Sequence, residues 1–219
     1  MKLLCYILVL GLLCLGAASS GAATLVMYDF NNLPTSTNSA TGFSTLSLTG
    51  GNLVNGGQAG TAYTDTSGGN HVAGRAAAWN SGVNDPPANT IVLSLSTLDL
   101  INMALRYDYR ATGTGPASAL LEYRVNKGVY VSLGIDNFTR DSLFHTMTRD
   151  LSAVAAIQDQ ISVDLRWTMA AGTGTGTFSF DNLELSGTVI PEPNTISMGA
   201  LAAIIFFSVR RRATRLAAI

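Results

Sequence analysis

The most constraining feature of this sequence is a strict alternation of apolar and polar residues in its central part. Ile161, Val163, Leu165, Trp167 and Met169 are separated by single polar residues over nine positions. Because successive side chains on a strand point to opposite faces, this period of two predicts a strand with one face buried. The alternation places Trp167 in the core.

The same alternation recurs in short segments that are separated by turn-forming residues. We expect further strands at residues 25–30, 43–48, 91–95, 105–110, 121–125 and 129–133. The Lys127-Gly128 pair predicts a hairpin turn, and the Gly-Thr repeat at 172–177 predicts a hairpin tip. Residues 151–157 predict no more than a turn or a short helical bridge. Many short strands without a repeat of fixed period predict an all-β fold, a β-sandwich.

The last predicted strand changes phase in its middle. Phe178 and Phe180 share one parity, whereas Leu183 and Leu185 share the other. A regular strand cannot bury all four side chains on one face. We therefore expect a β-bulge at residues 181–182.

The N-terminal segment, residues 1–23, has the composition of a secretory signal peptide. Lys2 precedes an apolar stretch, and small residues follow it up to Ala23. We expect a signal-peptide helix and cleavage after Ala23, with Ser19 as an alternative site. The other interpretation, a retained N-terminal anchor, requires a longer apolar stretch. Both cysteines, Cys5 and Cys14, lie in this segment, so the mature chain would contain no disulfide or thiol nucleophile.

The C-terminal segment, residues 188–219, combines three features. The first is the triplet Pro191, Glu192 and Pro193, and the second is an apolar stretch at 195–209 that predicts a transmembrane helix. The third is an arginine cluster that stops or anchors this helix at the cytoplasmic side: Arg210, Arg211 and Arg212. A buried core helix is the alternative, but the adjacent arginines argue against it.

This combination resembles the PEP-CTERM sorting signal of bacterial exported proteins. The resemblance implies that a membrane-embedded transpeptidase, exosortase, recognises Pro191, Glu192 and Pro193 and removes the tail. It also implies passage through the Sec translocon, cleavage by signal peptidase and an intermediate in the inner membrane. The mature ectodomain, residues 24–187, would then reach the cell envelope or the extracellular matrix.

The ectodomain itself is similar to the jelly-roll domains common among PEP-CTERM proteins and to carbohydrate-binding jelly rolls. The segments that carry this resemblance are 105–116 and 180–187. Jelly-roll modules often hold a structural calcium near the equivalent of Asp181, where the first strand would bring Asp29. This resemblance makes Asp181 and Asp29 candidate calcium ligands. The alternative is that Asp181 accepts hydrogen bonds from amides of the bulge.

Charge is distributed unevenly along the chain. Between Thr24 and Pro193 there are eight basic and fourteen acidic residues, which gives a net charge near −6. Nucleic-acid binding depends on neutralising phosphates with basic residues. The acidic ectodomain therefore argues against a nucleic-acid partner.

The sequence offers little support for catalysis. It contains two histidines, His71 and His145, without metal-binding spacing, and it lacks a Gly-x-Ser-x-Gly elbow. A glycosidase needs two carboxylates about 5–10 Å apart. Asp108, Glu122 and Asp164 lie on the polar phase of predicted strands, where we expect them to be solvated. We therefore predict a non-catalytic domain without a catalytic residue.

Two aromatic residues in polar, glycine-rich surroundings are candidate glycan contacts. They are Trp79 and Tyr63, because aromatic rings stack on sugar faces. Core packing is the alternative role for Trp79. The sequence thus favours a non-catalytic envelope or matrix protein associated with exopolysaccharide. The alternatives are a carbohydrate-binding module with a specific glycan ligand and, third, a glycan-active enzyme.

Overall fold

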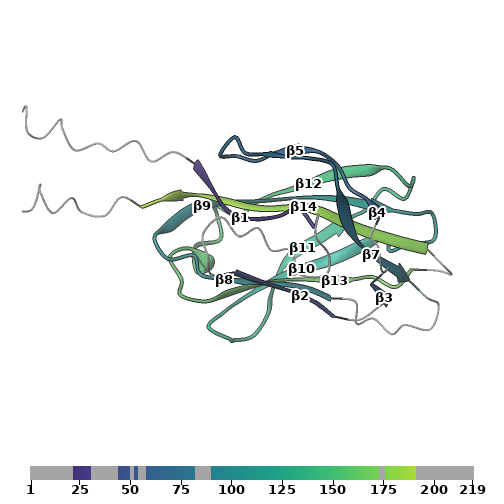
Figure 1. Ribbon diagram of the computed structural model, residues 1–219. Helices are drawn as coiled ribbons and strands as arrows, with labels where there is room; N and C mark the ends of the chain where they lie inside the picture. Colours follow the sequence, from purple (N-terminus) through teal and green to yellow (C-terminus); the bar gives the residue numbers. More distant parts are fainter. Residues whose placement is uncertain are drawn as a thin grey trace, which may run out of the picture. The chain divides into compact units, whose positions relative to one another are not determined.

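The computed structural model describes residues 22–30, 44–49, 52–53, 58–81, 90–172 and 176–190. In these residues nearly all regular structure is β-strand (Figure 1). The elements are β1 (Ala22–Tyr28), β2 (Ser44–Thr49), β3 (Asn52–Leu53), β4 (Gln58–Ala59), β5 (Tyr63–Thr64), β6 (Asn70–His71), β7 (Arg75–Ser81), β8 (Thr90–Leu95), β9 (Leu100–Ala111), β10 (Ser118–Val125), β11 (Val131–Asn137), β12 (Phe144–Asp150), the 3₁₀ turn η2 (Ala155–Ile157), β13 (Val163–Met169) and β14 (Gly176–Val189).

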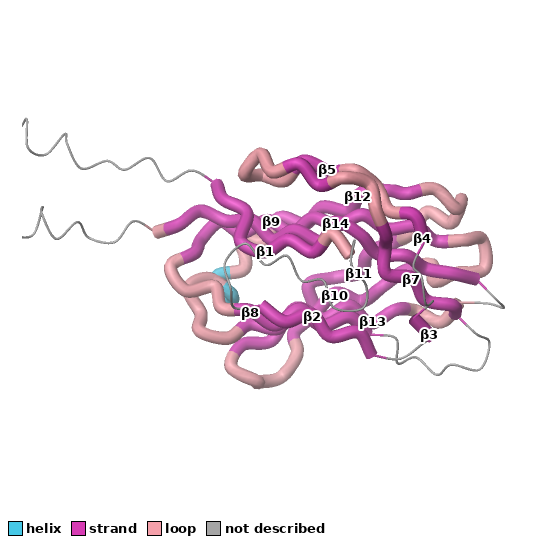
Figure 2. Tube along the Cα trace, in the orientation of Figure 1, coloured by secondary structure: helices cyan, strands magenta, loops and turns pink. Residues whose placement is uncertain are grey.

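The strands form two packed sheets. Sheet A has the order β12-β9-β14-β7-β3, with β1 paired to β14 and β4 paired to β7. Sheet B has the order β11-β10-β13-β8-β2, and β5 and β6 form a separate hairpin. Figure 2 shows the two layers and the short helical turn at one end. The prediction of an all-β sandwich is confirmed, and η2 confirms the short helical bridge within 151–157.

Aromatic side chains from both sheets fill the centre of the sandwich. Trp167 of sheet B and Tyr107 and Phe180 of sheet A are fully buried. The Trp167 ring meets Tyr107 and Phe180 edge to face, with centroids 5.7 and 5.6 Å apart. Large rings in this geometry bury much apolar area and contribute specific contacts as well. The predicted core position of Trp167 is confirmed.

The predicted β-bulge is present in β14. The register of β14 against β9 shifts between Asp181 and Glu184, and Asn182 has a positive φ of 47°. The extra residue lets β14 bury Phe178 and Phe180 on one side of the bulge and Leu183 and Leu185 on the other. The bulge also directs polar side chains outward, which matters for the site described below.

One predicted hairpin is confirmed and one is wrong. β10 and β11 pair antiparallel around a turn in which Asn126 and Lys127 both have positive φ. By contrast, β13 and β14, which flank residues 172–177, lie in different sheets. The glycines there permit a tight reversal, but each flanking strand pairs with strands that are distant in sequence. The connection therefore crosses from sheet B to sheet A.

The two predicted targeting segments lie outside the described residues. The compact unit of the chain is Gly21–Val189, close to the expected ectodomain bounds of 24–187. Within the part that the structure describes, no helix is both long and apolar enough to cross a bilayer. The signal peptide (1–23), the sorting signal (188–219) and its helix at 195–209 remain predictions.

Candidate functional site

The outer face of sheet A is covered by a segment that we call the strap, residues 60–74. It contains β5 and β6, and Figure 1 shows β5 above the layer that contains β9, β12 and β14. The strap leaves and rejoins the sheet at one place, because β4 pairs with β7 and the Gly60 amide donates to the Gly74 carbonyl at 3.0 Å. This part of the sheet is therefore closed by the chain itself.

Thr61 attaches the strap to the bulge of β14. Its amide donates to Asp181 Oδ2 at 2.8 Å, and its hydroxyl donates to Asp108 Oδ2 at 3.0 Å. The Asn182 side-chain amide donates to the Thr61 carbonyl at 3.1 Å and to Asp108 Oδ2 at 2.8 Å. Gly60 is required beside them, because a Cβ there would lie 2.4 Å from Asp181 Oδ2.

The environment of Asp181 favours its neutral form. Burial, followed by the nearby charges of Asp108 and Asp29, raises the pKa of Asp181 to about 7. Hydrogen bonds from the Thr61 and Asn182 amides oppose this shift without cancelling it. The carboxyl is therefore an acid group that keeps its proton close to neutrality.

The candidate calcium ligands are Asp181 and Asp29, and the charge of Asp29 is among the causes that raise the pKa of Asp181. Both oxygens of Asp181 already accept amides, Oδ1 from Asn182 at 2.9 Å and Oδ2 from Thr61. In the described part of the chain, no group of three or more His, Cys, Asp or Glu side chains is arranged to hold a metal. The bond from Asn182 matches the alternative in which Asp181 accepts a hydrogen bond from an amide of the bulge. Calcium binding remains a prediction, tested by a thermal melt with and without chelator.

Glu184 anchors the second half of the strap. Its Oε1 accepts from the Thr24 hydroxyl at 2.7 Å and from the Thr66 amide at 2.9 Å, and its Oε2 accepts from the Tyr63 hydroxyl. Burial alone would raise the pKa of Glu184, but these hydrogen bonds outweigh burial and lower it. The Arg106 guanidinium lies 3.6 Å from the centre of the Tyr63 ring. The candidate glycan contact Tyr63 is thus engaged by residues of its own chain.

Two carboxylates that we expected to be solvated are buried. Asp108 is 5% exposed because the strap covers it, and Asp164 is 7% exposed. Asp164 lies in sheet B, where the Arg124 guanidinium donates to it at 2.6 Å. The alternation assigned both residues to the outer faces correctly. The alternation did not reveal that the strap covers Asp108 or that Arg124 pairs with Asp164.

The two histidines each contact a carboxylate. His71 Nε2 lies 3.0 Å from Asp65 Oδ2, and its Nδ1 lies 3.7 Å from Asp29 Oδ2. His145 Nε2 lies 2.9 Å from Asp141 Oδ1 on the surface of β12. Neither contact includes a serine hydroxyl within hydrogen-bond distance. Both arrangements have the form of local structural pairs.

Among the described residues no segment covers the outer face of sheet B, which carries two parallel ion pairs. Glu122 lies opposite Arg166, and Arg124 lies opposite Asp164, on the neighbouring strands β10 and β13. Arg166 donates to Glu122 Oε2 through Nε at 2.9 Å and Nη2 at 2.7 Å. The side chains of Arg124 and Arg166 remain about a third exposed, at 31% and 30%. Donors and acceptors are therefore fixed in position while they still face solvent.

Tyr130 lies at the centre of this charged group. Its ring centre is 3.5 Å from the Arg166 guanidinium carbon and 4.6 Å from that of Arg124. Sequence reasoning missed Tyr130, because it placed this residue in the predicted strand at 129–133 without a partner from another strand. The available signal was the pair Arg124 and Arg166 on the polar phase of two adjacent predicted strands.

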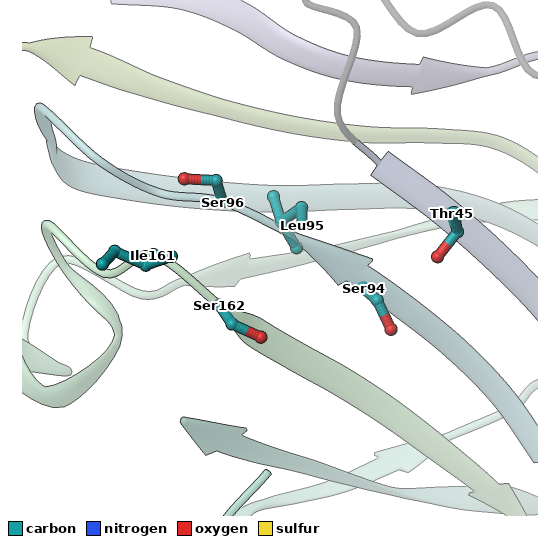
Figure 3. Close-up of a pocket in the computed structure, with 6 residues that line it drawn as sticks. All are labelled: Thr45, Ser94, Leu95, Ser96, Ile161 and Ser162. Carbon is teal, nitrogen blue, oxygen red and sulfur yellow. The ribbon is translucent and has the colours of Figure 1, made fainter. Parts of the chain in front are cut away.

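A shallow hollow of about 440 Å³ lies beside these ion pairs on the same sheet. Figure 3 shows the side chains that line it, which are Thr45, Ser94, Leu95, Ser96, Ile161 and Ser162. Ser94 is the register partner of both Thr45 and Asp164. The hydroxyls of the hollow are therefore continuous with the row that contains Asp164 and Arg124.

The remaining residues predicted for a site are not described by the structure. The backbone of Trp79 lies in β7 opposite Phe178, but the Trp79 side chain falls outside the description. Pro191, Glu192, Pro193 and the arginines at 210–212 also lie outside it. Their roles stay predictions.

Comparisons with known proteins give structural likeness without sequence relationship. No family model matches the chain, and no curated protein matches it. A mutant of a family 29 carbohydrate-binding module is 12% identical, with a TM-score of 0.41 and coverage of 76% of this chain and 92% of the module. The CBM22-1 xylan-binding domain of Xyn10C from Paenibacillus barcinonensis is 11% identical (TM-score 0.39; coverage 80% and 99%). The K3 cleaved adhesin domain of Lys-gingipain from Porphyromonas gingivalis is 12% identical (TM-score 0.42; coverage 74% and 98%).

Proposed function

We propose that this protein is an exported, non-catalytic β-sandwich that binds glycan on the outer face of sheet B. The observation that carries this proposal is the open row of Arg124, Arg166 and Tyr130 beside the hydroxyl-lined hollow. A sugar presents hydroxyls that both donate and accept, together with small apolar patches. Fixed charged groups, serine and threonine hydroxyls and the exposed Ile161 offer matching contacts.

The same face argues for binding rather than catalysis. Glu122 and Asp164 each accept from an arginine guanidinium. A carboxylate held in such a pair is poorly suited to donate a proton to a leaving group. We also propose that the sandwich is a jelly roll.

We also propose the route by which the domain is delivered. β14 ends at Val189, two residues before Pro191, so a cut in the tail would leave the described sheets complete. Exosortase processing would then release the domain to the envelope or matrix, where exopolysaccharide is the available glycan. Export by way of the Sec translocon and signal peptidase is part of this proposal.

Glycan binding is tested with the compact unit, residues 21–189, on a glycan array and by affinity electrophoresis in soluble polysaccharides. We expect Tyr130→Ala to weaken binding roughly tenfold through loss of the ring and the guanidinium positions that it supports. Trp79→Ala is the matched aromatic change in sheet A. Loss of binding with Trp79→Ala alone would move the site to β7, and absence of any retained polysaccharide would refute the proposal.

The sorting proposal is tested separately in a host with and without exosortase. Mass spectrometry of the mature protein should show loss of the tail in the first host and its retention in the second. Replacement of Pro191, Glu192 and Pro193 by alanine should have the same effect as absence of the enzyme. Recovery of the full-length chain, soluble and uncut, from exosortase-containing cells would contradict the proposal.

A further inference from the structure

The edge strands β12 of sheet A and β11 of sheet B lie on one open side of the sandwich. Within the described residues β11 pairs with β10 alone, and it carries the exposed apolar side chains of Val131 (48%) and Ile135 (58%). An apolar edge strand with free backbone groups is a template for a strand from another chain. A chain that stays monomeric therefore needs a structural feature that prevents this pairing.

The register of β11 shows which backbone groups face outward. The Phe138 amide donates to the Ala117 carbonyl at 2.8 Å, and Asp136 pairs with Ala119 two residues further along the ladder. Hydrogen-bonded and non-hydrogen-bonded pairs alternate in an antiparallel ladder. The Leu120–Ile135 pair is consequently a non-hydrogen-bonded one, and the N–H and C=O of Ile135 point away from β10.

Arg149 of β12 reaches across to these outward groups. Its Nη2 donates to the Ile135 carbonyl at 2.6 Å, and its Nε donates to Asp136 Oδ1 at 2.6 Å. The guanidinium also lies against Gly134, where a Cβ would be 4.0 Å from both terminal nitrogens. One side chain of sheet A thus lies along three successive residues of the edge of sheet B.

Asp136 holds this arginine in place. It points inward from an edge strand and is fully buried, and the Tyr107 hydroxyl donates to its Oδ2 at 2.5 Å. Burial and the Asp136 charge raise the pKa of Tyr107 above its usual range, so Tyr107 remains a donor. A charged side chain that points inward from an edge strand opposes pairing with another chain. The incoming strand would compete for the space that its counter-ion, here the Arg149 guanidinium, occupies.

We propose that Arg149 is an edge guard: it occupies the outward carbonyl of β11 and thereby prevents antiparallel pairing of β11 with the β11 strand of a second copy. The partner that the unguarded edge fits is another molecule of the same chain, because two copies related by a twofold axis present the same apolar strand to each other. This inference is independent of the proposed glycan site, which lies on the face of sheet B rather than on its edge.

The experiment measures the molar mass of the purified full-length chain by size-exclusion chromatography with light scattering. The test variant combines Arg149→Met with Asp136→Asn, so that no buried carboxylate loses its counter-ion and the Tyr107 hydroxyl keeps an acceptor. We expect its dimerisation to be at least tenfold tighter than that of the wild type. Thr148→Met, the neighbouring exposed residue of β12, is the matched control and should behave as the wild type.

Two further measurements identify the contact. Adding Ile135→Lys to the test variant should restore the wild-type mass, and hydrogen exchange at 131–137 should slow in the dimer. A test variant with the mass of the wild type, or one that dimerises regardless of Ile135→Lys, would overturn the proposal. If the test variant does not fold, Arg149→Lys decides: its single ammonium can satisfy Asp136 while it leaves the Ile135 carbonyl free. If the Arg149→Lys protein were then monomeric, the proposed role of Arg149 would be refuted.

Discussion

The two outer faces of the sandwich both carry carboxylates, but these carboxylates have different partners on the two faces. On sheet A, Asp108, Asp181 and Glu184 bind the strap through hydrogen bonds to the strap's amides and hydroxyls. On sheet B, Glu122 and Asp164 pair with arginines that stay about a third exposed. Carboxylates on sheet A therefore hold a segment of the chain in place, whereas those on sheet B hold arginine side chains that remain in contact with solvent.

This difference indicates which face is available to a ligand. A glycan approaching sheet A would have to displace a strap that is held by buried groups, and each donor or acceptor left unpaired would cost about 1–3 kcal/mol. A glycan approaching sheet B exchanges contacts with exposed guanidinium groups and hydroxyls for contacts of the same kind. The comparison thus supports sheet B as the binding face, and it makes quantitative predictions for both faces.

The largest effect should come from pH. The pKa of Asp181 is about 7 in the folded protein against an ordinary value of 3.8, so the native state holds a proton that the unfolded state has released. The contribution of Asp181 to stability should therefore fall as the pH rises from about 4 to 7, at up to ~1.4 kcal/mol per pH unit and by roughly 3 kcal/mol in all. Above pH 7 this contribution levels off. Urea unfolding across this range measures it.

The assignment to Asp181 has its own control. Asp181→Ser should flatten the profile between pH 4 and 7, whereas Asp150→Ser, which alters an exposed carboxylate on β12, should leave it unchanged. A fall of equal size in the Asp181→Ser protein would mean that another group holds the proton. Asp181 would then be ionised beneath the strap at neutral pH.

The second effect concerns the closeness of the strap to the bulge. In Gly60→Ala the new Cβ would lie 2.4 Å from Asp181 Oδ2 and 3.1 Å from the Arg75 backbone, so the strap must move. We expect a loss of about 2–3 kcal/mol in the free energy of unfolding. Gly113→Ala, where no atom lies within 4 Å of the added methyl, should change it by less than about 0.5 kcal/mol. Equal behaviour of the two variants would show that the strap is loosely held.

Much of the fold followed from alternation, because a strand with one buried face alternates apolar and polar residues. The phase change between Phe180 and Leu183 predicted the bulge, because four apolar side chains had to reach one core. The crossing at 172–177 was not predictable from local residues. Glycine permits either a hairpin or a crossing, and the partners of β13 and β14 decide which one forms.

The candidate site was less accessible from sequence. Alternation placed Asp108 on an outer face, but the strap that covers it is a glycine- and threonine-rich segment without periodicity. Tyr130 was missed for a related reason: two arginines from different strands give it its role, and this is a tertiary relationship. Tyr63 was identified as an aromatic in polar surroundings, and the structure shows that its hydroxyl meets Glu184.

The third prediction compares one carboxylate from each face. Glu184→Ala removes the acceptor of Thr24, Tyr63 and Thr66, which leaves one buried and two partly buried donors unpaired and should cost about 2 kcal/mol. Glu122→Ala removes the partner of Arg166, which can turn to water, and should cost no more than about 0.5–1 kcal/mol. Chemical denaturation of both variants at pH 7 provides the comparison. Similar losses would remove the distinction between the two faces.

The smallest effect on stability should come from Tyr130, and it separates binding from folding most directly. Tyr130→Ala removes a ring that lies beneath two exposed guanidinium groups, and cation–π contacts at such positions contribute about 0.5–1 kcal/mol. The free energy of unfolding of the variant should therefore be nearly unchanged, while its glycan affinity falls roughly tenfold. If Tyr130→Ala instead destabilises the protein as strongly as Glu184→Ala, the residues on sheet B would be structural like those beneath the strap. That result would contradict the proposed binding surface on sheet B, because its charged side chains would then be needed for the stability of the sheet.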